Sequence, residues 1–433
     1  MNKNVNIAVV GLGQVGIYLF NELNIKKKDI ETKTGKKIII KAISAKNINK
    51  KRRFKINKKI FYKNPLNIFK KNRIDVLFEM IGLSDGISKK VVETALKKKI
   101  HVITPNKALI AKHGDYLSQL AEKHKVNLEF EASVAGGIPV LRTIKEGLAT
   151  NRIEKFYGIL NGTSNYILSE MEKSKDSFNN VLKKAQNLGY AELDPKFDLN
   201  GYDALAKVKI LSSLAFNNKI SKNTCLMEGI QNIELKDIEI ASQLNLRIKL
   251  LGISELIKNQ LFERVHPCLV SKDSYIGNVN GVMNAIILNG RPVGETVLQG
   301  EGAGPGPTSS SLLSDLLSIL RGNIKRPFGV SGNKRKNVKI HNHKNYINSL
   351  YLRFEVNDKP GVLSAITNSL AKYNISVKRI VQTPDKKNKK ATIVIITHNC
   401  KESSSNKCLS FLRKNKNIIK KPIYIRVINL NGN

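Results

Sequence analysis

Four carboxylates lie within twelve residues of a strongly basic chain, in the segment AELDPKFDLNGYDALAKVKI (191–210). They are Glu192, Asp194, Asp198 and Asp203. Pro195 and Gly201 interrupt regular structure, so the segment predicts a loop followed by a helix that begins at about Tyr202. Carboxylates gathered in this way suit a substrate that carries an ammonium group.

Asp203 and Lys207 are four residues apart, so they share one face of the predicted helix. The other positions of this helix are mostly apolar, which predicts that it is largely buried. Burial lowers the pKa of a lysine and nearby carboxylates raise it, and this balance can produce a proton donor. The alternative interpretation is a surface ion pair, which contributes little to stability.

A glycine-rich turn, GLGQVG, follows the first predicted strand (5–10) and opens a helix. It comprises Gly11, Leu12, Gly13, Gln14, Val15 and Gly16. In a βαβ unit the first glycine permits the turn, the second admits a pyrophosphate and the third allows close helix–strand packing. The helix N-terminus adds partial positive charge. We therefore predict a dinucleotide site, although the same pattern alone also occurs in plain tight turns.

The second predicted strand (37–44) ends without the acidic residue that would hold the ribose 2′-hydroxyl of NAD. Lys46 lies near that position, and Lys50, Lys51 and Arg52 follow it. These cations favour a 2′-phosphate pocket, so we predict NADP(H) as the preferred cofactor, with NAD(H) as the alternative. The competing explanation is the excess of lysine found along the whole chain.

Lys107 closes the motif TPNK at the end of another predicted strand (100–107). It should therefore lie at the carboxyl edge of the sheet, where ligands bind in doubly wound folds. It could equally be the first exposed residue of the next helix. Further strands at 74–82 and 126–134 alternate with helices, which predicts a Rossmann-type α/β domain.

After residue 134 the pattern changes. Several short strands between 246 and 300 predict a mixed sheet in an α+β domain, and residues 308–322 predict a helix whose Ser/Thr run can cap its start. Residues 348–433 give the order βαββαβ of a ferredoxin-like unit. We expect a dinucleotide-binding domain at 1–134, completed by about 305–330, a catalytic and dimerisation domain at 135–304, a polar linker at 331–347 and a small domain at 348–433.

The chain has 74 Lys+Arg against 34 Asp+Glu, a formal net charge of +40. Lysine is spread along the chain rather than clustered with aromatic residues, so we predict solvated faces and no specific nucleic-acid site. No apolar run approaches the roughly 20 residues that span a bilayer, and no signal peptide is visible. The four cysteines are scattered, which does not suggest zinc or disulfides. A cytoplasmic protein is expected.

Nearly the full chain resembles the homoserine dehydrogenase family. The segments that carry the resemblance are GLGQVG, TPNK, FEASVAGGIPV, LNGTSNYIL, AELDPKFDLNGYDALAKVKIL and GEGAGPGPTSSSLLSDL. The tail, from DKPGVLSAIT, resembles an ACT domain. The resemblance implies reversible NAD(P)-dependent interconversion of L-homoserine and L-aspartate 4-semialdehyde, in the biosynthesis of threonine, methionine and isoleucine.

The resemblance also implies roles for individual residues. Lys207 would exchange a proton with the substrate oxygen, and Lys107 would be its partner near the nicotinamide. The substrate would be held by Glu192, Asp198, Asp203 and Thr163, and Gly302 would lie against the nicotinamide. A monovalent cation, Na⁺ or K⁺, would bind backbone carbonyls of Glu131, Val134, Gly136 and Ile138; a plain glycine-rich crossover is the alternative for that loop.

An ACT domain implies an amino-acid effector, for which we expect threonine at the turn 357–361, and at least a homodimer or homotetramer. Two other functions are compatible with parts of the sequence. The same architecture could act on another amino-acid semialdehyde or hydroxy acid. A basic nucleic-acid-binding protein with a vestigial nucleotide fold is the other, and the dispersed lysines speak against it.

Overall fold

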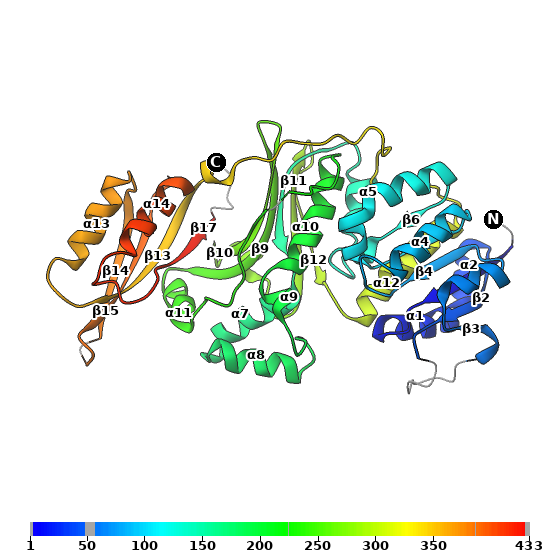
Figure 1. Ribbon diagram of the computed structural model, residues 1–433, viewed down its shortest axis with the longest axis horizontal. Helices are drawn as coiled ribbons and strands as arrows, with labels where there is room; N and C mark the ends of the chain where they lie inside the picture. The colour runs from blue at the N-terminus through cyan, green and yellow to red at the C-terminus, as the bar shows by residue number, and fades with distance from the viewer. Residues whose placement is uncertain (1–2, 48–56, 224, 386, 429–433) are drawn as a thin grey trace.

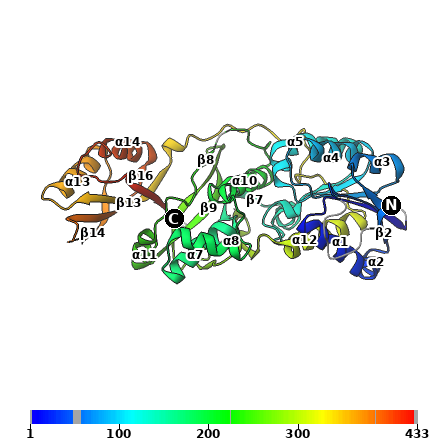
Figure 2. The same cartoon turned by 60° about the horizontal axis from the view of Figure 1, so that its bottom comes forward.

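The computed structural model is elongated, and three parts follow one another along its long axis (Figure 1). It describes residues 3–47, 57–223, 225–385 and 387–428. In Figure 1 the N-terminal part lies at the right in blue, the middle part in green and the C-terminal part at the left in orange and red; Figure 2 shows the same order from another direction.

The N-terminal part contains a six-stranded, all-parallel sheet in the order β3-β2-β1-β4-β5-β6. Most of its strands are largely buried apolar runs, as is typical of parallel sheets, although the strand at 37–44 also carries the exposed Lys37 and Lys41. They are β1 (Asn4–Val10), β2 (Lys37–Ser44), β3 (Phe61–Tyr62), β4 (Val76–Glu79), β5 (His101–Ile103) and β6 (Leu128–Glu129). The predicted Rossmann-type sheet is thus confirmed.

Helices cover both faces of this sheet. On one face lie α1 (Gln14–Ile25), α2 (Lys27–Thr34) and α12 (Pro305–Leu320); on the other lie α4 (Ile87–Lys97) and α5 (Lys107–His124), and α3 is a single turn (Ile68–Lys71). The late helix α12 returns to pack beside α1 (Figure 1). The expected Ser/Thr cap of α12 is wrong: the helix begins earlier, because Pro305 at its first position is preorganised for helix, and Gly304 is its N-cap.

The middle part combines a mainly antiparallel sheet with helices; one short strand pairs in parallel, so the predicted mixed sheet is confirmed. Its strands are β7 (Arg152–Ile159), β8 (Leu226–Met227), β9 (Leu246–Ile257), β10 (Gln260–Ser271), β11 (Met283–Arg291) and β12 (Gly294–Glu301). Its helices are α6 (Val140–Arg142), α7 (Gly162–Ser174), α8 (Phe178–Asn187), α9 (Lys196–Leu199), α10 (Tyr202–Ala215) and α11 (Leu235–Gln243). Strands β9 and β10 are longer than expected because they pair along their whole length around a turn at Lys258 and Asn259, both with positive φ.

The C-terminal part has the predicted βαββαβ order with one added short strand. Its elements are β13 (Ile347–Asn357), α13 (Val362–Lys372), β14 (Val377–Asp385), β15 (Lys390–Thr397), β16 (Cys400–Lys401), α14 (Glu402–Leu412) and β17 (Ile423–Val427). Strand β17 pairs with β13 on one side and with β10 on the other. The sheets of the middle and C-terminal parts therefore form one continuous sheet.

The polar segment before β13, expected as a linker, packs against the body of the protein. Arg335 is buried, donates from Nε to the Asn218 carbonyl at 3.1 Å and forms a 2.7 Å ion pair with Asp115. Its guanidinium also stacks on Phe328 at 3.8 Å. The polar, basic composition of this segment predicted a linker, but Arg335 is held by Asp115 of α5 and by Asn218 and Phe328 from two other segments.

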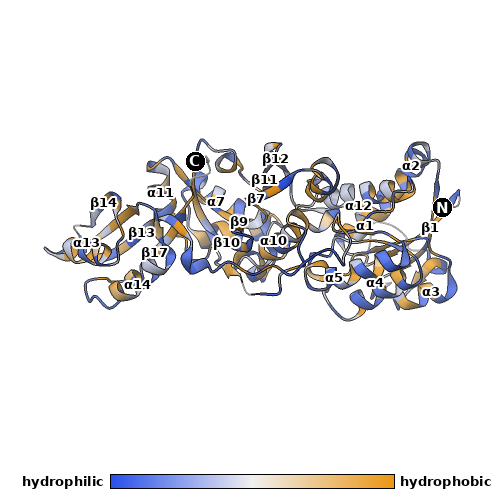
Figure 3. Cartoon of the chain, turned by 90° about the horizontal axis from the view of Figure 1, so that it is seen from above, coloured by the Kyte–Doolittle hydropathy of each residue, from blue (hydrophilic) through white to orange (hydrophobic). Residues whose placement is uncertain are grey.

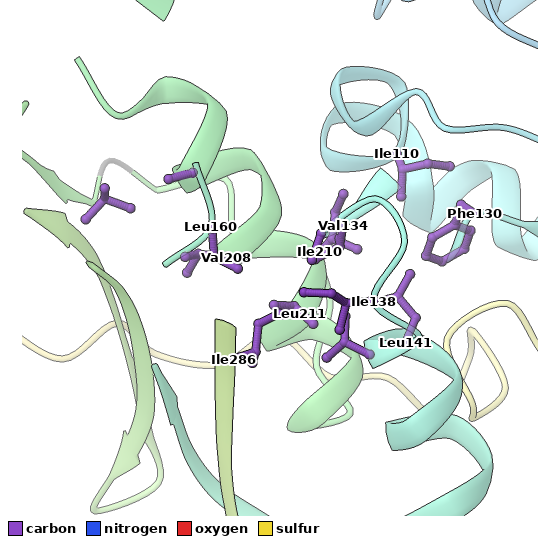
Figure 4. Close-up of a cluster of buried hydrophobic side chains, with 14 of the residues drawn as sticks. Ile110, Phe130, Val134, Ile138, Leu141, Leu160, Val208, Ile210, Leu211 and Ile286 are labelled. Carbon is purple, nitrogen blue, oxygen red and sulfur yellow. The ribbon is translucent and has the colours of Figure 1, made fainter. Parts of the chain in front are cut away.

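Hydrophobic packing continues from the N-terminal part into the middle part. Figure 4 shows Ile110 and Phe130 on one side of a cluster that also contains Leu160, Val208 and Ile286. Hydrophilic stretches occur along all three parts (Figure 3). Among the residues that the structure describes, no helix is both long and apolar enough to span a bilayer.

Candidate active site

Two lysines from different parts of the chain meet at Asp203, near the start of α10. Lys207 Nζ lies 2.8 Å from Asp203 Oδ2 one helical turn away, and Lys107 Nζ lies 2.7 Å from Asp203 Oδ1. The Asp203 and Lys207 side chains are 5% and 8% exposed, which excludes the surface-pair interpretation, whereas that of Lys107 is 35% exposed. Lys107 is the first residue of α5, so this site lies where the dinucleotide-binding sheet meets the middle part.

The three groups have different pKa shifts. Burial favours a neutral Asp203, but Lys207 and Lys107 together hold its pKa well below the usual range. Burial lowers the pKa of Lys207 below its ordinary value, although Asp203 opposes this. Burial has the same effect on the more exposed Lys107, but Asp203 dominates and raises its pKa. The site thus holds an ionised carboxylate, a firmly charged outer lysine and an inner lysine that loses its proton more easily.

Two residues between β7 and α7 hold this arrangement from the other side. The carbonyl of Leu160 accepts a hydrogen bond from Lys207 Nζ at 2.6 Å. The Asn161 amide donates to Asp203 Oδ2 at 2.9 Å and to Asp198 Oδ1 at 2.8 Å. Burial raises the pKa of Asp198, and the charge of Asp203 raises it further. Asp198 therefore belongs to the same cluster as Asp203 and the lysines.

Sequence reasoning missed Asn161, and it also missed Asn106, which precedes Lys107. Asn106 caps α5 by accepting from Leu109 N at 3.1 Å, and it donates to Leu83 O at 2.8 Å. The buried carboxylate of Glu79 supports the same turn through Thr104. The available signal was the residue type: asparagine just before a predicted helix is a preferred N-cap.

The other predicted substrate residues lie at the rim of the cluster. Glu192 is exposed, and its negative charge acts on Lys107. Asp194 is also exposed and pairs only loosely, at 3.9 Å, with Lys196. Thr163 is at the start of α7, where its hydroxyl donates to Tyr190 O at 2.7 Å and so ties α7 to the loop that carries Glu192. Of the four acids in the opening segment, Asp198 and Asp203 therefore lie in the cluster, while Glu192 and Asp194 lie outside it.

The turn GLGQVG fits a dinucleotide. Gly11 has φ +100°, and a Cβ there would lie 2.5 Å from the Met80 carbonyl; a Cβ on Gly16 would lie 2.0 Å from the Gly11 carbonyl. Gly13, the N-cap of α1, has open space where its side chain would be, as the approach of a phosphate requires. Leu12 is buried, while Gln14 and Val15 begin the helix. Lys46 is exposed just beyond β2; Lys50, Lys51 and Arg52 lie outside the described residues.

Gly302 follows β12, and the structure gives a packing reason for its lack of a side chain. A Cβ there would lie 2.0 Å from Nδ2 of the fully buried Asn284. Its carbonyl also lies close to Gly136, where a Cβ would be 2.6 Å from the Gly302 oxygen. The glycine at 302 is thus required by protein packing, independently of any contact with a nicotinamide.

The loop expected to bind a cation presents backbone oxygens. Three of the four predicted carbonyls accept hydrogen bonds: Glu131 O from Val134 N, Gly136 O from Ser311 Oγ and Ile138 O from Val140 N. The Glu131 carboxylate accepts from Leu141 N at 2.9 Å and Arg142 N at 2.8 Å, so it caps the following helix. The described residues contain no group of three or more His, Cys, Asp or Glu that could hold a metal ion. A cation here would depend on the carbonyls.

A dinucleotide-binding turn together with a buried lysine that can exchange a proton is typical of oxidoreductases that act on CH–OH groups with NAD(P). Comparison with known proteins identifies the family within this class of oxidoreductases. Residues 11–131 match the family described as "Homoserine dehydrogenase, NAD binding domain", residues 139–317 match "Homoserine dehydrogenase" and residues 350–407 match "ACT domain".

Homoserine dehydrogenases of known sequence are similar over nearly the whole chain. That of Neisseria gonorrhoeae is 38% identical, over 92% of this chain and 93% of its own, and that of Pseudomonas aeruginosa is 36% identical over 99% and 100%. The solved homoserine dehydrogenase of Thiobacillus denitrificans is 34% identical, with a TM-score of 0.90 over 99% of both chains. The chain belongs to the homoserine dehydrogenase family, whose members interconvert L-homoserine and L-aspartate 4-semialdehyde with NAD(P) in amino-acid biosynthesis.

Proposed function

We propose that Lys207 is the acid–base residue of this reaction and that Asp203 and Lys107 set its protonation. The observation that carries the proposal is the position of the ionised Asp203 between the two lysines, with Lys207 almost fully buried. Bound NAD(P)H would supply the hydride that reduces the aldehyde carbon. The chain must then deliver a proton to the developing alkoxide, or remove one from the alcohol in the reverse direction.

The contacts of Lys207 support this assignment. Its ammonium donates to Leu160 O and to Asp203, which leaves its third N–H for the substrate oxygen. Because burial lowers its pKa, deprotonation for the reverse reaction costs less than for a solvated lysine. Lys107, more exposed and firmly charged, would stabilise negative charge on the same oxygen.

We propose that the carboxylates bind the polar ends of the substrate. Asp203 and Asp198 would lie beside the hydroxyl and ammonium groups, and Glu192, on its exposed loop, would complete the ammonium site. Thr163 would contribute backbone or hydroxyl lone pairs from the start of α7. Gly11–Gly16 would hold the pyrophosphate, Lys46 a 2′-phosphate, and Gly302 would lie near the nicotinamide.

Four further assignments belong to the proposal. NADP(H) is preferred because Lys46, and no acidic residue, lies near the end of β2, where an NAD-selective site would have a carboxylate. A monovalent cation binds the carbonyls of Glu131, Val134, Gly136 and Ile138.

The chain divides at about residues 134, 304 and 347, and α12 completes the first domain. The protein forms a homodimer or homotetramer. The two outermost strands of its continuous sheet, β12 and β14, each have one edge without a partner strand in the order of that sheet.

The direct test follows absorbance at 340 nm with aspartate 4-semialdehyde, first with NADPH and then with NADH, in K⁺, Na⁺ and a bulky organic cation. Rapid oxidation that is faster with NADPH supports the substrate and cofactor assignments. Oxidation only with a different amino-acid semialdehyde would favour the second candidate substrate. Replacement of Lys46 by Glu should reverse the cofactor preference, while Lys41→Glu, an exposed position within β2, serves as the matched control.

A further inference from the structure

The side chain of Asn161 is buried at the junction of β7 and α7, between two acidic residues of the site. Its two amide N–H groups are divided between Asp198 Oδ1 at 2.8 Å and Asp203 Oδ2 at 2.9 Å. Its oxygen accepts from Ser164 N at 2.8 Å, which caps α7. The amide thus uses both donors and its acceptor at once, each with a different partner.

These contacts require an amide. Two carboxylates that face one another repel, and a neutral group that donates to both relieves this without adding charge. A hydroxyl has one donor and cannot serve both carboxylates, and a third carboxylate would increase the repulsion. The cap on α7 needs only an oxygen, which serine and aspartate also provide. The cap function alone therefore does not explain why asparagine stands here.

We propose that Asn161 is a positioning residue of the reaction: it fixes the Asp203 carboxylate so that one oxygen faces Lys107 and the other faces Lys207, and it holds Asp198 beside them. The inference rests on the proposed function, because Asn161 acts through Asp203 on Lys207. Since the Leu160 carbonyl next to it also holds Lys207, the end of β7 orients both members of the Asp203–Lys207 pair.

The experiment compares Asn161→Ser and Asn161→Asp in the full-length enzyme, since both replacements keep an oxygen to cap α7. We expect kcat to fall by about 100-fold in each, the loss that misplacement of a catalytic group by about 1 Å can cause. Both variants should still unfold cooperatively, with a lower thermal midpoint in Asn161→Asp, where a third carboxylate adds repulsion. Ser177→Ala, which removes the N-cap of the neighbouring α8, is the control for a lost cap and should keep kcat unchanged.

The pH profile separates positioning from a structural effect. Lys207 is faced by Asp203 from α10, Asp198 from α9 and Lys107 from α5. Asn161→Asp adds a negative charge to this group and should move the Lys207 limb of the kcat profile to higher pH, whereas the neutral Asn161→Ser should lower kcat with a smaller displacement. Wild-type kcat in either variant, once it is shown to be folded, would overturn the inference.

Lys207→Ala, measured in parallel, separates this inference from the proposed function. If Lys207→Ala is inactive while both Asn161 variants are fully active, only the role of Asn161 fails. If Lys207→Ala is itself active, the assignment of the acid–base residue fails. If a variant does not fold, the other still decides, because each keeps the cap by a different side chain.

Discussion

Lys107 and Asp203 form a 2.7 Å ion pair between the dinucleotide-binding sheet and the middle part of the chain. Lys107 begins a helix that packs on the sheet, and Asp203 lies in the first turn of α10. Because Asp203 also binds Lys207, the pair connects the cofactor side of the site with the proposed acid–base residue. Because both lysines bind the same carboxylate, the protonation state of each lysine depends on that of the other.

Replacement of Lys107 by Met should change the behaviour of Lys207. The positive charge of Lys107 lowers the pKa of Lys207, so its removal should raise that pKa and move the alkaline limb of the kcat profile to higher pH. We also expect a loss of kcat of about 10-fold or more, because one stabilising charge is lost. The measurement is kcat against pH, with Lys112→Met, an exposed lysine of the same helix, as control. An unmoved limb would contradict the coupling.

The two directions of the reaction should depend on pH in opposite ways. Reduction of the aldehyde needs protonated Lys207, so its kcat should fall as pH rises through the lysine pKa. Oxidation of homoserine needs neutral Lys207, so its kcat should rise over the same range. Burial lowers this pKa, so both limbs should lie below the pH expected for a solvated lysine. Limbs that run in the same direction would speak against a single acid–base lysine.

The sequence predicted the local relationships of the site. Helix α10 begins at Tyr202 as expected, which places Asp203 and Lys207 on one face, and the turn GLGQVG lies between β1 and α1. The Asp203–Lys207 pair and the glycine turn each depend on residues only a few positions apart. Hydrophobic periodicity and glycine spacing predict such local features directly. The cap of α8 is equally local: the Ser177 side chain accepts a hydrogen bond from Asn180 N.

Contacts between distant segments could not be predicted in this way. The two carboxylates that Asn161 binds lie on α9 and α10, about 40 residues further along the chain. From the sequence, only the helix-capping role of Asn161 could have been predicted. The pairing of β17 with β10 and the burial of Arg335 also depend on how the parts pack together. The polar, basic composition of residues 331–347 predicted a linker. Composition alone does not show which cation in such a segment has a buried partner.

Arg426 joins the C-terminal part to the middle part and should be important for stability. It is buried, and it pairs with Glu228 of the middle part at 2.8 Å and with Glu402 of α14 at 2.6 Å. Arg426→Met would leave both carboxylates short of a partner, so we expect a loss of about 3–5 kcal/mol in the free energy of unfolding. Urea unfolding measures this, with the exposed Arg413→Met as control. Equal stability of the two variants would contradict the account.

Threonine should bind at the turn 357–361. This turn lines a cavity of about 420 Å³ that includes Asp358, and α13 begins directly after Gly361. The carboxylate of Asp358 would attract the effector's ammonium group, and the helix N-terminus its carboxylate. Calorimetry should show binding that Asp358→Ala abolishes and that Asp385→Ala, an exposed acid of the same part, keeps. If calorimetry shows no binding and threonine leaves the activity unchanged, threonine is not the effector of this protein.

The most direct test of the account is turnover of Lys207→Ala in both directions, with NADPH binding measured by fluorescence. Lys209→Ala, a half-exposed lysine on the same helix, is the matched control. We predict that Lys207→Ala lowers kcat by about 100-fold or more in both directions, as expected for a lost acid–base group, while NADPH still binds and Lys209→Ala stays active. Unchanged turnover in a folded Lys207→Ala protein would contradict the assignment of Lys207 as the acid–base residue.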